Sequence, residues 1–249
     1  MSRPDTAPAF GAQDRGQSSV VGAALLLGMT VVALGLLTAS VGSVVDGHAA
    51  RADADRVAED LRTGLAPVET TGHRTVDVRF TGGRLYTAER QVRVYDSTGL
   101  VANVDIGALV YENGQRRVAA VAGAIVRGQN ENTWFAETPP VVGSASDDIL
   151  VVGLANLSAG KEAVGGGQVT ARLRTNVTHD RQSLGTGVYR VAVETRAPAA
   201  FERYFADRGA SVSRTDIDGD GIVSVVASFP GRRQAYVVEH TTRLEVEHA

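Results

Sequence analysis

The chain has 249 residues, a formal net charge of −3 and no cysteine. This length is enough for one or two packed domains, and a composition of 43% hydrophobic and 21% charged residues is ordinary for a folded protein. The absence of cysteine excludes disulfide bonds, cysteine-ligated zinc, iron–sulfur clusters and thiol nucleophiles. The near-neutral charge argues against nucleic acid as a partner, because proteins that bind it carry basic patches.

An uncharged segment from Ser18 to Val45 predicts a membrane-spanning helix. Thirteen of its 28 residues are Val or Leu. About 20 apolar residues are needed to cross a hydrocarbon core, and thirteen Val or Leu residues contribute about −4 to −8 kcal/mol to the free energy of insertion. A buried core helix is the alternative, but such helices rarely lack charge for seven turns.

A short polar stretch, Met1 to Gly16, precedes this segment and ends in Asp14-Arg15-Gly16. An ordinary secretory signal has its cleavage site after the apolar run, so that the run is removed. Here no A-x-A site follows the run. Arg3 and Arg15 flank the helix on one side only, which by the positive-inside rule predicts a cytoplasmic N-terminus and an external C-terminal part.

The order of charged leader, Gly, polar pair and long apolar helix resembles the class III signal of type IV pilins and archaellins, in the form found in haloarchaeal surface proteins. The resemblance implies that a prepilin-type leader peptidase cuts between Gly16 and Gln17 and that the apolar helix stays on the mature chain. Many bacterial pilins have Glu at the fifth mature position, where this chain has Val21. An uncleaved signal anchor with the same topology is the alternative.

The apolar run continues into an amphipathic one. Val57, Leu61 and Leu65 recur every four positions, and alanines run beside them, which is the pattern of one helix face. Gly64, Ala66 and Pro67 predict its end. We therefore expect one long helix, apolar in its first half and amphipathic in its second. Two helices hinged near Asp46-Gly47 are the alternative.

From Thr70 onward the hydrophobic period changes to two, which predicts β-strands. Candidate strands are Val76–Phe80, Ala108–Tyr111, Val118–Val121, Ile149–Leu154, Val169–Thr175, Val188–Thr195, Ile222–Phe229 and Tyr236–Val246, and Leu85, Val92 and Val94 continue the pattern after Gly82-Gly83. Asn113-Gly114 predicts a tight hairpin, and turns are expected at 165–167 and 183–187. Many short strands without alternating helices favour an antiparallel sandwich or meander.

One short helix is expected among the strands. It starts with Pro198 and stops at Gly209, and its Phe201, Tyr204 and Phe205 share one face. We expect this face to be core rather than a binding platform. The aromatic helix, the Tyr111–Gly114 hairpin and the segment 138–140 resemble an uncharacterised haloarchaeal family of pilin-like secreted proteins, which implies a surface location and no known activity.

Two kinds of motif predict candidate sites: an acidic motif for calcium binding and N-x-[ST] sequons for glycosylation. Asp216, Asp218 and Asp220, followed by Gly221, resemble the first half of a calcium loop. Its twelfth position is Ala227 instead of Glu, so a solvated turn is favoured over calcium, and no other cofactor is expected. Asn156 and Asn176 begin N-x-[ST] glycosylation sequons.

The predicted fold is α+β: a long N-terminal transmembrane helix followed by an antiparallel, β-rich, sandwich-like domain with one short aromatic helix near the C-terminus. The predicted divisions are a leader at 1–16, the helix at 17–66 and an extracellular β domain at 70–249.

The predicted function is that of a non-enzymatic, pilin-like cell-surface protein. Its partners would be membrane lipid, the leader peptidase and other pilin subunits. The helix from Val20 to Val45 would serve as anchor or filament core, with Gly28, Gly35 and Gly42 near one face for close helix approach. A monomeric, membrane-anchored extracellular binding module is the alternative.

Overall fold

A computed structural model describes residues 15–65, 72–144, 148–158 and 163–248. The chain divides into two compact units, residues 1–48 and 49–249, which are described separately. The secondary structure confirms the expected fold class, a long apolar N-terminal helix followed by a β-rich domain.

Helix α1 runs from Arg15 to Leu65 and is continuous through Asp46 and Gly47. Its first part, up to His48, makes up the described residues of the first unit. Its last described residue is Leu65, and the predicted end at residue 66 lies outside the described part of the chain.

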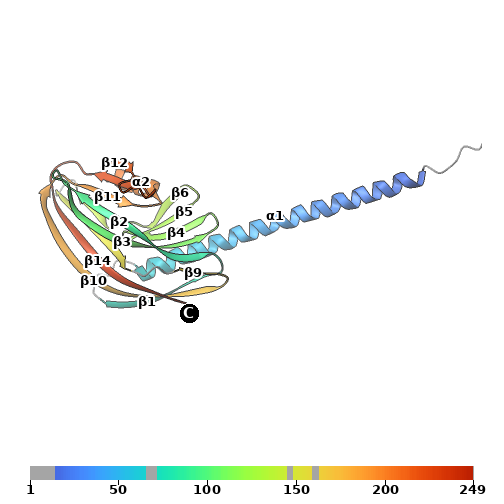
Figure 1. Cartoon of the computed structure of the whole chain (residues 1–249), viewed down its shortest axis with the longest axis horizontal. Helices are drawn as coiled ribbons and strands as arrows, with labels where there is room; N and C mark the ends of the chain where they lie inside the picture. Colours follow the sequence, from blue (N-terminus) through green and yellow to red (C-terminus); the bar gives the residue numbers. More distant parts are fainter. Residues whose placement is uncertain (1–14, 66–71, 145–147, 159–162, 249) are drawn as a thin grey trace, which may run out of the picture. The chain divides into compact units, whose positions relative to one another are not determined.

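Fourteen strands and a second helix make up the described part of the second unit beyond α1 (Figure 1). The strands are β1 (Gly72–Phe80), β2 (Arg84–Tyr95), β3 (Leu100–Asn113), β4 (Arg116–Val121), β5 (Ala124–Gln129), β6 (Asn132–Glu137), β7 (Val141–Ser144), β8 (Ile149–Ser158), β9 (Ala163–Gly165), β10 (Val169–Gly187), β11 (Arg190–Glu194), β12 (Ser211–Thr215), β13 (Ser224–Ser228) and β14 (Arg233–His248). Helix α2 spans Pro198–Ala206.

The strands form two sheets. One has the order β1-β10-β14-β8-β7, and the other has the order β12-β13-β11-β2-β3-β4-β5-β6, with β9 paired to β2. Pairing is antiparallel except between β14 and β8, which run parallel. A parallel pair needs a long crossover, and the chain between β8 and β14 supplies one by way of β9–β13 and α2.

The observed strands differ from the expectation in several ways: β5, β6, β7, β9 and β12 were not predicted, and two predicted turns lie elsewhere. Residues 183–187, predicted as a turn, are the last part of β10, where the register with β14 shifts between Ser183 and Gly185. Gly185 has a positive φ at this irregularity, a conformation that glycine adopts without steric cost. The β3–β4 turn consists of Gly114 and Gln115 rather than Asn113 and Gly114, and only Gly114 has φ above zero.

The larger sheet is covered on both faces, which explains the unbroken apolar run in β3. Val110 belongs to one core cluster, whereas Leu109 and Tyr111 belong to the other. The second cluster includes Val57 and Leu61 of α1, which are fully buried as the helical spacing predicts.

Helix α2 closes the first cluster. Phe201, Tyr204 and Phe205 are buried, which confirms that this face is core. Phe201 and Tyr204 pack edge-on against Phe135 of β6, with ring centroids 5.0 and 5.7 Å apart. The Tyr204 hydroxyl donates to the carbonyls of Pro139 and Val141.

Candidate functional site

The apolar part of α1 exposes its side chains all around. Every large hydrophobic residue from Val20 to Val45 is more than half exposed, for example Leu34 at 62% and Val45 at 59%. This is the one helix in the described part of the chain that is long and apolar enough to cross a membrane. Apolar surface of this extent on a helix is stable in lipid or against another apolar surface.

The helix glycines lie in open space. A Cβ atom built on Gly28, Gly35 or Gly42 would meet nothing within 4 Å. Their seven-residue spacing rotates each by only about 20° relative to the previous one on a straight α-helix, so the three share one side of α1. Small residues on one side let two helix backbones approach closely.

The predicted cleavage point lies in the first turn of α1. Gly16 and Gln17 are helical residues, next to Arg15 at the helix start. The remaining leader residues, 1–14, lie outside the described part of the chain, so the leader stays a prediction.

The acidic turn between β12 and β13 forms as a hydrogen-bonded loop. One carboxylate oxygen from each of Asp216, Asp218 and Asp220 lies within 4.8 Å of the others, and all three residues are exposed. Asp216 accepts hydrogen bonds from the backbone N–H groups of Gly219 and Gly221.

The other carboxylates of this turn also have protein partners. Asp220 accepts from the backbone N–H of Ile222, and Asp218 pairs with the guanidinium of Arg93 at 2.7 Å. That hydrogen bond holds the pKa of Asp218 below its usual value. The twelfth loop position, Ala227, is fully buried in β13, so this loop lacks its last calcium ligand.

Both sequon asparagines lie in strands rather than in loops. Asn156 of β8 is half-buried, and its side-chain amide donates to Glu239 of β14 at 2.7 Å. Asn176 of β10 is also half-buried, between partners on β1 and β14. Glycosylation of either residue stays a prediction.

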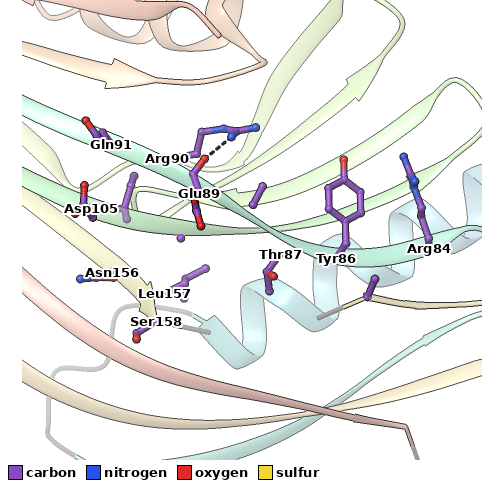
Figure 2. A pocket seen from close by; sticks show the side chains of 14 residues that line it. Arg84, Tyr86, Thr87, Glu89, Arg90, Gln91, Asp105, Asn156, Leu157 and Ser158 are labelled. Carbon is purple, nitrogen blue, oxygen red and sulfur yellow. Dashed lines mark hydrogen bonds between the residues drawn. The ribbon is translucent and has the colours of Figure 1, made fainter. Parts of the chain in front are cut away.

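A cavity of about 940 Å³, the polar cleft, lies beside β2, β3, β8 and β9 (Figure 2). It is lined by Arg84, Tyr86, Thr87, Ala88, Glu89, Arg90, Gln91, Asp105, Ile106, Gly107, Asn156, Leu157, Ser158 and Ala163. In Figure 2, Tyr86 and Arg84 project to one side of β2 and Thr87 to the other. Carboxylate, amide and hydroxyl groups there can hydrogen-bond a hydroxylated ligand.

The sequence reasoning missed this cleft. The usable signal was the run of polar residues at alternate positions of β2, namely Thr87, Glu89 and Gln91, because alternate residues of a strand lie on one face. The lining residues from β8 and β9 could not be predicted, because these strands lie far from β2 in the sequence and no local pattern shows that they pack beside it.

A histidine pair was missed as well. His179 of β10 and His240 of β14 are cross-strand partners, and their Nδ1 atoms lie 2.6 Å apart. Burial, and then the neighbouring His179, lower the pKa of His240 below its usual 6.5. The two residues are 61 positions apart, so spacing along the chain gave no signal.

Comparison with known proteins gives one family. None of the curated proteins and none of the solved structures matches the chain. A family described as "Family of unknown function (DUF7289)" matches residues 15–245, which include the whole of α1 and nearly all of the β domain. Because this match covers most of its length, the chain belongs to that family of unknown function.

Proposed function

We propose that this chain is a pilin-like cell-surface protein with a structural or adhesive role. The apolar part of α1 anchors it in the membrane or assembles it into a filament, and the β domain lies outside the cell. It acts by packing and binding rather than by catalysis, and its partners are membrane lipid, a prepilin-type leader peptidase and other pilin subunits.

The exposed apolar surface of residues 20–45 is the observation that carries the proposal. In water each exposed Val or Leu side chain costs about 1.5–3 kcal/mol relative to a buried one. The thirteen Val and Leu residues together make an aqueous environment untenable for this segment. Lipid, or the same segment of other copies, removes that cost.

The second part of α1 supports the same function. Ala54, Val57, Ala58 and Leu61 are buried in the second unit's own core. The helix therefore uses its amphipathic residues within the β domain and leaves its apolar residues for lipid or for other subunits. A surface subunit that is held in the membrane by its own helix requires this arrangement, in which one part of the helix packs on the β domain and the other part packs in lipid or against other subunits.

Cell-surface shearing tests the proposal. In the native host, we expect the protein both in membranes and in filaments released by shearing. Gly35→Leu should deplete the sheared fraction and leave the membrane fraction intact, because a large side chain blocks close helix approach. Ala33→Leu, two positions away on a different side of the helix, is the matched control and should assemble normally.

A monomeric anchored binding module is the second candidate, and the polar cleft favours it. A concave site of about 940 Å³ lies within the range of small-molecule sites. If the wild-type protein stays wholly in detergent-soluble membranes and never enters sheared filaments, the filament role is overturned and the anchored module replaces it.

A further inference from the structure

A second cavity, the arginine pocket, lies on the opposite side of β2–β4 from α1. Its volume is about 100 Å³. Its floor consists of the aliphatic residues Ala108, Val110, Ala119, Val121 and Val126. Its polar lining includes Arg90, Arg117, Thr133 and the loop 195–197 with Arg196.

The arginines reach this pocket from three elements. Arg117 shares one face of β4 with the floor residues Ala119 and Val121, because strand residues alternate. Arg90 stands on β2, where its side chain is only 8% exposed. Arg196 follows β11 and is exposed to solvent.

Carboxylates compensate only part of this charge. Arg90 Nη1 lies 3.8 Å from the buried Glu194, and Arg117 Nε lies 3.7 Å from Glu112. Glu112 is shared, because it binds Arg84 at 2.9 Å and accepts from the Tyr86 hydroxyl at 2.8 Å. The described residues form no ion pair with Arg196 within 4 Å.

The arginines also act on one another. Burial is the main cause that lowers the pKa of both Arg90 and Arg117. The charge of Arg196 lowers the pKa of both further, and that of Arg117 adds to the effect on Arg90. All three arginines line the same pocket of about 100 Å³, so an anion bound there would be attracted by all three positive charges.

Two buried polar atoms of the pocket have no hydrogen-bond partner in the described structure. They are Nε of Arg117 and Oγ1 of Thr133. A buried group without a partner costs about 1–3 kcal/mol, and a ligand oxygen would recover that cost. Arg127 also lines the pocket, but its guanidinium is paired with Asp55 of α1. We therefore do not count it among the arginines that could bind an anion.

We propose that the arginine pocket binds a small carboxylate with a short aliphatic body. The carboxylate lies among Arg90, Arg117 and Arg196, since guanidinium groups match its planar oxygens. The aliphatic part rests on the alanine and valine floor. Roughly 150 Å³ of enclosed cavity holds a molecule the size of benzene, so an open pocket of about 100 Å³ fits a branched acid of four carbons.

Calorimetric titration of the full chain in detergent micelles tests this proposal. The probes are isobutyrate, its neutral isostere isobutyramide, inorganic sulfate and a tripeptide that ends in valine. Isobutyrate should bind at least about tenfold more tightly than isobutyramide, which is the effect of one charge-assisted contact of about 1.4 kcal/mol. It should also bind more tightly than sulfate, which has no aliphatic body.

Neighbouring residues of β4 supply a matched pair of variants. Arg117→Gln should weaken isobutyrate binding at least about tenfold. Arg116→Gln removes the same charge from the same strand, but on the opposite face and outside the pocket, and should leave binding unchanged. Arg196→Gln should also weaken binding; since Arg196 is exposed, this variant keeps the test valid if Arg117→Gln fails to fold.

Each outcome decides the proposal. The proposal is overturned if isobutyrate does not bind or if sulfate binds more tightly than isobutyrate. It is also overturned if Arg116→Gln and Arg117→Gln have equal effects on binding. Binding of both isobutyrate and the tripeptide supports it and identifies the carboxylate end of a larger molecule as a ligand. Binding of isobutyrate alone supports it and identifies a free acid.

Discussion

Asp53 joins α1 to the β domain through a group of hydrogen bonds. Its side chain is 3% exposed, and its Oδ2 accepts hydrogen bonds from the backbone N–H and the hydroxyl of Thr81 and from the N–H of Gly82. Arg56 lies 3.7 Å from its other oxygen. The carboxylate therefore fixes the turn between β1 and β2 against the helix.

Replacing this carboxylate should destabilise the β domain. We expect Asp53→Ala to lower the free energy of unfolding by about 1–3 kcal/mol, because it removes the acceptor of three part-buried hydrogen bonds. Asp55→Ala, two residues along on the exposed side, should cost about 1 kcal/mol or less. Denaturant unfolding of both variants measures the difference, and equal losses would contradict this role.

At the scale of single residues, the sequence predicts the burial of apolar side chains better than the contacts of polar ones. Val57 and Leu61 were found from their helical spacing, and both are buried. Asp53 was missed because it reads as part of the charged face, between the i,i+4 partners Arg51 and Asp55. Its partners lie 28 and 29 residues away, where no local pattern reaches.

At the scale of elements, Gly107 sets the approach of β3 to β8. A Cβ atom there would lie well inside van der Waals contact with the carbonyl oxygen of Leu157. The two strands belong to different sheets, and both residues line the polar cleft. The glycine therefore allows the sheets to meet at the cleft.

A methyl group at this point should force the strands apart. Gly107→Ala is expected to lower the free energy of unfolding by about 1–3 kcal/mol, the usual cost of overpacking. Gly128→Ala, in β5, is the control, since its Cβ would meet its nearest neighbour at an ordinary 3.5 Å. Thermal unfolding of the two variants tests this, and an unchanged midpoint for Gly107→Ala would refute the tight approach.

The His179–His240 pair makes the β10–β14 pairing sensitive to acid. The lowered pKa of His240 means that the folded chain binds fewer protons than the unfolded chain as pH falls below 6.5. Stability is therefore retained above 6.5 and falls in the window below it. His240→Gln should flatten this dependence, whereas His73→Gln, an exposed histidine of β1, should not.

Unfolding measured across this pH range provides the test. A wild-type stability that rises as pH falls below 6.5, or a His240→Gln variant with the wild-type pH dependence, would show that His240 does not titrate in this way.

The sequence pattern predicted the positions of strands and helices more reliably than it predicted which strands pair with one another. Nine of the fourteen strands and α2 were found, because each depends on neighbours in the chain, whereas β5, β6, β7, β9 and β12 were missed. The parallel pairing of β8 with β14 was not predicted, because it depends on a crossover through five further strands. The register shift at Ser183–Gly185 looked like a turn, since Gly, Ser and Thr suit both.

At the scale of the whole molecule, the charge is segregated. Residues 18–45 carry none, and all of the charge that remains after Gly16 lies beyond Val45. The long apolar helix could be predicted from composition alone, because the capacity to cross a membrane depends on composition and length. Neither the polar cleft nor the arginine pocket could be, because each combines residues from strands far apart in the sequence.

The proposed function depends on removal of the leader, and the intact mass of the protein purified from its native membrane measures this most directly. The account predicts a mature chain that begins at Gln17 and lacks residues 1–16. A mass that includes Met1 to Gly16 would contradict it, because a chain that keeps its leader is an uncleaved signal anchor and not a processed pilin-like subunit.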